Sequence, residues 1–145
     1  MPDFSPITEQ LYVGGYLEDG DWHILAALGV TVDINLMGEA QDRFTPHAAP
    51  DVYLWLPIVD WTAPDQQTLQ TGARFIELMV EQGRSVYVHC FAGVGRSPTL
   101  AAAYLVTTGL SSSEALQLLK EKRPVVDPNR AQIRALQAFE RSLKT

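Results

Sequence analysis

Hydrophobic and polar positions along the chain repeat with two periods, one typical of β-strands and one typical of α-helices. Short apolar runs rich in β-branched residues predict strands over 11–14, 30–36, 52–58 and 85–89. Apolar positions three and four residues apart predict helices over 21–28, 65–81, 98–108, 111–122 and from 129 to about 143. Because strands and helices alternate, the pattern predicts an α/β fold with a mostly parallel central sheet. We expect helices on both faces of this sheet and a helical layer at the C-terminus.

Polar residues mark where helices begin and where a long loop interrupts the pattern. Residues 38–50 are polar and contain two prolines, so they predict a loop between two strands. Ser111 and Glu114 form a capping-box pattern, and Asn129 and Gln132 fit the same pattern before the last helix. Gln132 could instead position a water molecule, but capping is the preferred interpretation.

The only cysteine, Cys90, stands where a predicted strand turns into a predicted helix. The sequence there reads His89-Cys90-Phe91-Ala92-Gly93-Val94-Gly95-Arg96-Ser97. Backbone N–H groups of such a turn, together with a helix N-terminus, favour an anion. The same field stabilises a thiolate, and an arginine fork suits two phosphate oxygens. The alternative, that Cys90 is only a small buried residue, does not explain the glycines, arginine and serine that follow it.

Composition and charge narrow the function further. With 145 residues, the chain is expected to form a single domain over 1–145. Its net charge of −6 argues against nucleic acid or anionic lipid as a partner, so an anionic ligand must be bound locally. We expect no secretory leader and no membrane insertion, because the start of the chain and its apolar runs fit neither. One cysteine allows no internal disulfide and predicts a cytoplasmic location.

The run His-Cys, five residues and Arg-Ser resembles the signature of the cysteine-dependent protein tyrosine phosphatases. The continuation 97–104 is similar to the dual-specificity branch, and the similarity extends through 7–14, 28–31 and 123–129. A nucleotide-binding loop does not fit, because no Gly-Lys-Ser/Thr is present. The resemblance implies a phosphatase-like fold and hydrolysis of phosphomonoesters through a phosphocysteine intermediate.

Within this resemblance, each residue of the run has an expected role. Cys90 is the nucleophile, Arg96 and residues 91–95 bind the phosphate, and His89 supports the loop. Ser97 is expected to donate a hydrogen bond to the sulfur. The catalytic residues are therefore Cys90, Arg96, Ser97 and a general acid, and the substrate-binding residues are Phe91, Ala92, Gly93, Val94, Gly95 and Arg96.

The leaving oxygen needs a proton, so a carboxylic acid must cover the cleft. Asp60 is the best candidate, because it starts the loop after the strand that ends at 58 and precedes Cys90 by 30 residues. This spacing resembles the family's placement of its acid. Asp65 is the rival, although a helix N-cap explains it fully.

The expected substrate is a phosphorylated protein or peptide, with phosphotyrosine first and phosphoserine or phosphothreonine as further targets. A phosphoinositide, sugar phosphate or nucleotide remains an alternative, although the loop lacks the lysines that relatives acting on inositol lipids often carry. A non-catalytic phosphate-binding module is a third hypothesis, and it is disfavoured because Cys90, Arg96 and Asp60 are all present. No cofactor, metal or obligate partner is expected.

Overall fold

A five-stranded sheet organises the protein, whose computed structural model describes residues 2–144. The strands are β1 (Phe4–Thr8), β2 (Leu11–Gly14), β3 (Val30–Met37), β4 (Val52–Ile58) and β5 (Ser85–His89), in the spatial order β1-β2-β5-β3-β4. β1 pairs antiparallel with β2, and all other pairs are parallel. The carboxyl ends of four parallel strands therefore meet at one edge of the sheet.

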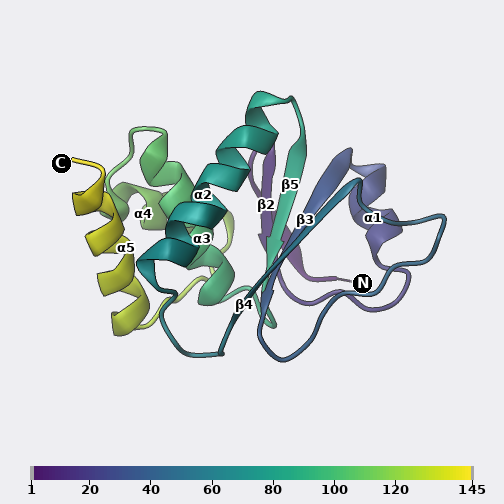
Figure 1. Ribbon diagram of the computed structural model, residues 1–145, viewed down its shortest axis with the longest axis horizontal. Helices are drawn as coiled ribbons and strands as arrows, with labels where there is room; N and C mark the ends of the chain where they lie inside the picture. The colour runs from purple at the N-terminus through teal and green to yellow at the C-terminus, as the bar shows by residue number, and fades with distance from the viewer. Residues whose placement is uncertain (1, 145) are drawn as a thin grey trace.

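Helices cover both faces of this sheet (Figure 1). They are α1 (Trp22–Ala27), α2 (Gln66–Glu81), α3 (Arg96–Thr107), α4 (Ser112–Lys122) and α5 (Arg130–Ser142). α1 packs on β3 at one face, whereas α2 and α3 pack on β5 at the other, with α4 and α5 against α3. The predicted fold class, a mostly parallel α/β sheet with a helical C-terminal layer, is confirmed.

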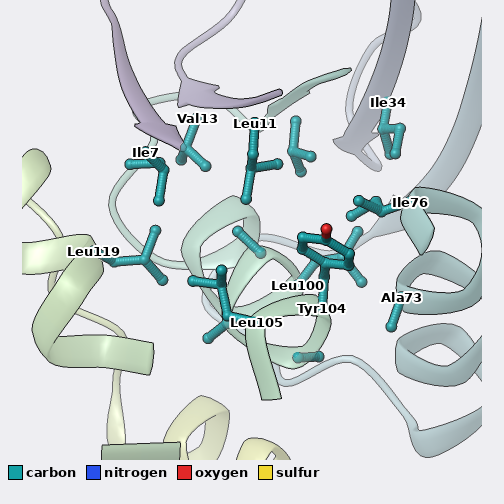
Figure 2. Packing of buried hydrophobic residues seen from close by; sticks show 14 of the residues in the cluster. Ile7, Leu11, Val13, Ile34, Ala73, Ile76, Leu100, Tyr104, Leu105 and Leu119 are labelled. Carbon is teal, nitrogen blue, oxygen red and sulfur yellow. The ribbon is translucent and has the colours of Figure 1, made fainter. Parts of the chain in front are cut away.

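The main core lies between the strands and α3. Figure 2 shows Leu11 and Val13 of β2 on the strand side, and Leu100 and Leu105 of α3 facing them. Every residue of α3 from Arg96 to Val106 is buried, because this helix is surrounded by α2, α4, α5 and the sheet. Apolar burial on this scale stabilises each large side chain by about 1.5–3 kcal/mol. The first turn of α3 is thus held rigidly by the core.

Two features differ from the sequence prediction. β1 was not predicted, because its short FSPIT sequence contains a proline; an edge strand tolerates that residue. α3 begins at Arg96 rather than 98, so that Arg96 and Ser97 lie in its first turn. Among residues 2–144, no helix combines the length and hydropathy needed to cross a bilayer.

Candidate active site

The turn between β5 and α3 is held from outside by a neighbouring segment. Arg123, which is 2% exposed, donates from Nε to the Gly93 carbonyl (3.0 Å) and from Nη2 to the Ala92 carbonyl (3.0 Å). The backbone N–H of Asp127 donates to the Val94 carbonyl at 2.9 Å. The N–H groups of residues 91–95 form no hydrogen bond within residues 2–144. The carbonyl groups are therefore satisfied outside the loop, and the N–H groups stay available to an anion.

Cys90 lines a pocket of about 150 Å³. Its Sγ is 3.2 Å from the hydroxyl Oγ of Ser97, and that Oγ lies 3.4 Å from the carbonyl of Gly14. The structure thus brings the predicted nucleophile and the predicted hydroxyl donor together. The pocket is lined by Asp60, Trp61, Cys90, Phe91, Ala92, Val94, Gly95, Arg96, Asp127 and Gln132.

Arg96 is 1% exposed, and three hydrogen bonds to two neighbours fix its guanidinium. Nη1 donates to Oε1 of Glu39 (2.7 Å) and to the Ile58 carbonyl (2.9 Å), and Nη2 donates to Oε2 of Glu39 (2.9 Å). These hydrogen bonds hold the pKa of Glu39 below its usual value. Nε of Arg96 has no hydrogen-bond partner within the described chain. A buried donor without a partner is costly, and it is the atom that a ligand oxygen would satisfy.

The structure places Asp60, and not Asp65, at the pocket. Oδ1 of Asp60 is 3.2 Å from Nη2 of Arg96 and accepts the N–H of Trp61 at 2.9 Å. Asp65 is the N-cap of α2 and accepts the N–H of Thr68 at 2.7 Å. Of the two candidate acids, only Asp60 therefore lines the pocket.

His89 lies beneath the loop, fully buried with two carboxylates. Its Nε2 is 2.6 Å from Oδ2 of Asp42 and 3.3 Å from Oδ1 of Asp33. Burial alone would lower the pKa of His89, but the two carboxylates raise it to about 10. Burial raises the pKa of Asp33 well above its usual range. Burial would also raise the pKa of Asp42, but the hydrogen bonds with His89 and Asp33 and the charge of His89 together lower it. His89 is thus held between two carboxyl groups whose pKa values move in opposite directions.

The same three residues bring metal-ligating atoms within 4.8 Å of one another. A metal ion would compete with a proton for Nε2, because the two carboxylates raise the pKa of His89 to about 10. Imidazole and carboxylate are also in direct contact at 2.6 Å, the length of a charge-assisted hydrogen bond. The three residues thus form a hydrogen-bonded cluster next to Cys90, the residue that follows His89.

Sequence reasoning missed Glu39, Asp42 and Arg123. Residues 38–50 were predicted only as a polar loop, yet this loop brings one carboxylate to Arg96 and one to His89. The signal that could have found them is position: both acids follow the carboxyl end of β3, next to β5 in the sheet. Arg123 begins the stretch 123–129 that carries part of the family resemblance, but nothing in that local pattern predicts that its guanidinium binds the loop.

Comparisons with known proteins agree with this geometry. The family model described as "Dual specificity phosphatase, catalytic domain" matches residues 11–142. Dual specificity protein phosphatase 1 of Arabidopsis thaliana is 34% identical over 142 residues, covering 97% of this chain and 70% of that protein. Dual specificity protein phosphatase 5 of Rattus norvegicus is 36% identical over 121 residues, covering 82% of this chain. The crystal structure of human DUSP28 superposes with a TM-score of 0.88 at 29% identity, covering 100% of this chain and 97% of that one.

An α/β sheet whose central strand turns through a cysteine loop into a buried helix defines the class of cysteine-dependent phosphatase folds. Within that class, the chain belongs to the dual specificity phosphatase catalytic domain family. The matched region spans 31% of the rat phosphatase, so this chain corresponds to only part of that relative.

Proposed function

We propose that this chain hydrolyses phosphomonoesters through a phosphocysteine intermediate, with phosphotyrosine and also phosphoserine or phosphothreonine of proteins as substrates. The observation that carries the proposal is the unpartnered Nε of Arg96 in the pocket that also holds Cys90. A rigid cation with one donor to spare suits a phosphate oxygen.

In the first step, the Cys90 thiolate attacks phosphorus, and a sulfur–phosphorus bond forms while the ester bond breaks. Asp60 gives its proton to the leaving oxygen. Arg96 and the N–H groups of 91–95 hold the equatorial oxygens, so charge stabilisation dominates the rate.

In the second step, the Asp60 carboxylate takes a proton from water, and the resulting hydroxide attacks phosphorus. The sulfur–phosphorus bond breaks, inorganic phosphate leaves and the Cys90 thiolate is restored. A hydrogen bond from Ser97 Oγ stabilises this thiolate, which the 3.2 Å separation of the two atoms supports.

The pocket favours a simple monoester over a polyphosphorylated lipid headgroup. Among the described residues that line it, Arg96 is the only cationic side chain, and Asp60 and Asp127 are acidic. Additional phosphates on an inositol ring would meet carboxylates rather than lysines. Exposed aromatic rings of Trp61 and Phe91 at the rim suit contact with a phosphotyrosine ring or a peptide. We place this activity in the cytoplasm, since a thiolate nucleophile needs a reducing compartment.

Turnover of an aryl phosphate by four proteins tests the proposal: wild type, Cys90→Ser, Asp60→Asn and Asp65→Asn. We expect turnover by wild type, none by Cys90→Ser, and about a 10²–10⁴-fold loss for Asp60→Asn, the usual contribution of general acid catalysis. Asp65→Asn is the matched control, because asparagine also caps helices and should leave turnover nearly unchanged. A wild type that binds phosphate but shows no turnover would refute the proposed enzymatic activity. A larger loss for Asp65→Asn than for Asp60→Asn would refute the choice of acid.

A substrate panel then separates the classes of phosphomonoester. Phosphotyrosine peptides should be hydrolysed with the highest kcat/KM, ahead of phosphoserine peptides, phosphoinositides in vesicles and nucleoside monophosphates. A higher kcat/KM for any non-protein substrate would overturn the preference for proteins.

A further inference from the structure

Two side-chain amides at the start of α5 bind the loop that carries Asp60. Nδ2 of Asn129 donates to the carbonyl of Trp61 at 2.8 Å, and Nε2 of Gln132 donates to the carbonyl of Thr62 at 3.3 Å. The residues joined by these two hydrogen bonds are 68 and 70 positions apart in the sequence. They are therefore tertiary contacts between the acid loop and a helix end.

The same two amides also cap α5 with their oxygen atoms. Oδ1 of Asn129 accepts the N–H of Gln132, and Oε1 of Gln132 accepts the N–H of Asn129, both at 2.9 Å. A capping box requires only these acceptor atoms, and Ser or Thr with Glu would supply them. The capping box of α4 is of that kind, with Ser111 and Glu114. Capping alone leaves the choice of two amides unexplained, whereas a need for NH₂ donors toward the loop explains it.

The loop itself needs to be held. Trp61 has φ of +67°, a left-handed conformation that is unfavourable for a residue other than glycine. Its side chain is 75% exposed, so packing of the ring does little to maintain this conformation. The bond from Asn129 acts on the carbonyl of this residue, and the N–H of the same residue donates to Oδ1 of Asp60. Fixing Trp61 therefore fixes the carboxylate that precedes it.

The segment that carries the two amides is also hydrogen-bonded to residues 91–95, here called the phosphate loop. Arg123 binds two carbonyl groups of that loop, and the N–H of Asp127 binds a third. Gln132 is 2% exposed, lines the pocket, and would lie 2.8 Å (Oε1) from a Cβ placed on Gly95. One short stretch of chain, 123–132, thus contacts both the phosphate loop and the loop that carries Asp60.

We propose that Asn129 and Gln132 are positioning residues that hold the acid loop over Cys90, and that they act on the reaction through Asp60. The proposal rests on the proposed function, because it assigns these amides to the proton transfer. Removing one donor while keeping its cap should weaken catalysis only where the leaving group needs a proton.

Asn129→Ser is the decisive variant, because serine caps helices as well as asparagine does but is too short to reach the Trp61 carbonyl. We expect kcat/KM for phenyl phosphate to fall roughly tenfold, the factor that one net hydrogen bond carries. For 2,4-dinitrophenyl phosphate, whose leaving group needs no proton, we expect less than a twofold change. In an Asp60→Asn background, Asn129→Ser should cause no further loss. Equal losses on both substrates, no loss on either, or additive losses in the double variant would overturn the proposal.

Gln10→Ala is the matched control. Gln10 also donates from a side-chain amide to a backbone carbonyl, that of Arg84 at 2.9 Å, but at the opposite end of β5. It should leave the ratio of kcat/KM for the two substrates unchanged, and a shift as large as that of Asn129→Ser would also overturn the proposal.

Amide hydrogen exchange provides a readout that does not depend on activity. In Asn129→Ser, and in Gln132→Glu, which keeps the capping box, exchange over residues 59–64 should be faster while α5 exchanges as in wild type. Unchanged exchange over 59–64 would refute the proposal that the two amides hold this loop, even if the enzyme were active. A wild type that hydrolyses neither ester would refute the proposed function. Hydrogen exchange would still show whether Asn129 and Gln132 hold the loop.

Discussion

Gly93 is the residue of the phosphate loop at which a single methyl group should do the most damage. Its φ is +68°, a conformation that glycine adopts without penalty and alanine does not. A Cβ built there lies 2.6 Å from Nη2 of Arg123 and 2.7 Å from the carbonyl carbon of Gly14. The second contact is about 0.7 Å short of the 3.4 Å at which ordinary contact begins. Because Gly14 contributes backbone at the end of β2, either this strand end or the loop must move.

The free energy of unfolding gives the size of this effect. The left-handed backbone conformation alone costs alanine about 1–2 kcal/mol. Overpacking against fixed atoms adds about 1–3 kcal/mol, so Gly93→Ala should destabilise the protein by about 2–5 kcal/mol. Gly83→Ala is the matched control, since Gly83 has φ of +78° and no atom within 4 Å of the added Cβ. That variant should show the backbone cost alone.

Urea unfolding of both variants measures the difference, and aryl phosphate turnover measures the effect on the site. We expect Gly93→Ala to lose most of its kcat/KM and its affinity for orthovanadate, while Gly83→Ala keeps both. If the two variants were equally stable and equally active, the crowding argument would be wrong, and the loop would not depend on close approach to Gly14.

Three further predictions concern other parts of the site. Peroxide should inactivate the enzyme by oxidising Cys90, with recovery only after an external thiol is added, because the chain has no second cysteine; activity that survives prolonged peroxide would contradict a thiolate nucleophile. The pKa of His89 is raised from 6.5 to about 10, so its contribution to stability is complete below pH 6.5 and is lost as pH rises toward 10. Urea unfolding should show this decline, of at most about 1.4 kcal/mol per pH unit, in wild type and not in His89→Gln. Arg123→Met leaves two loop carbonyl groups without their donor and should cost about 2 kcal/mol of unfolding free energy, with weaker orthovanadate inhibition; unchanged values would show that the loop holds itself.

The sequence alone predicts the elements that depend on residues close to one another in the chain. Strands, helices and caps follow from periodicity and from side chains a few residues apart, and Asp65 was correctly distinguished as a cap by that reasoning. The cysteine loop is also local, since nine consecutive residues place a thiol, an anion cradle and a guanidinium together. β1 was missed because its stability comes from pairing with β2, and its own proline-containing sequence does not favour a strand.

The remaining parts of the site depend on topology, and one rule accounts for where they come from. In a parallel sheet, ligands bind beyond the carboxyl ends of the strands. Each of the four parallel strands supplies a group there: Gly14 ends β2, Glu39 follows β3, Asp60 follows β4 and Cys90 follows β5. Applied to the predicted strands, this rule places the four residues at one site, but it does not assign their roles. Side-chain geometry supports the roles that we propose. Glu39 binds Arg96 through both oxygens, whereas Asp60 contacts it through one oxygen and lines the pocket. A carboxylate bound at both oxygens orients the cation, and one bound at a single oxygen keeps the other free to carry a proton.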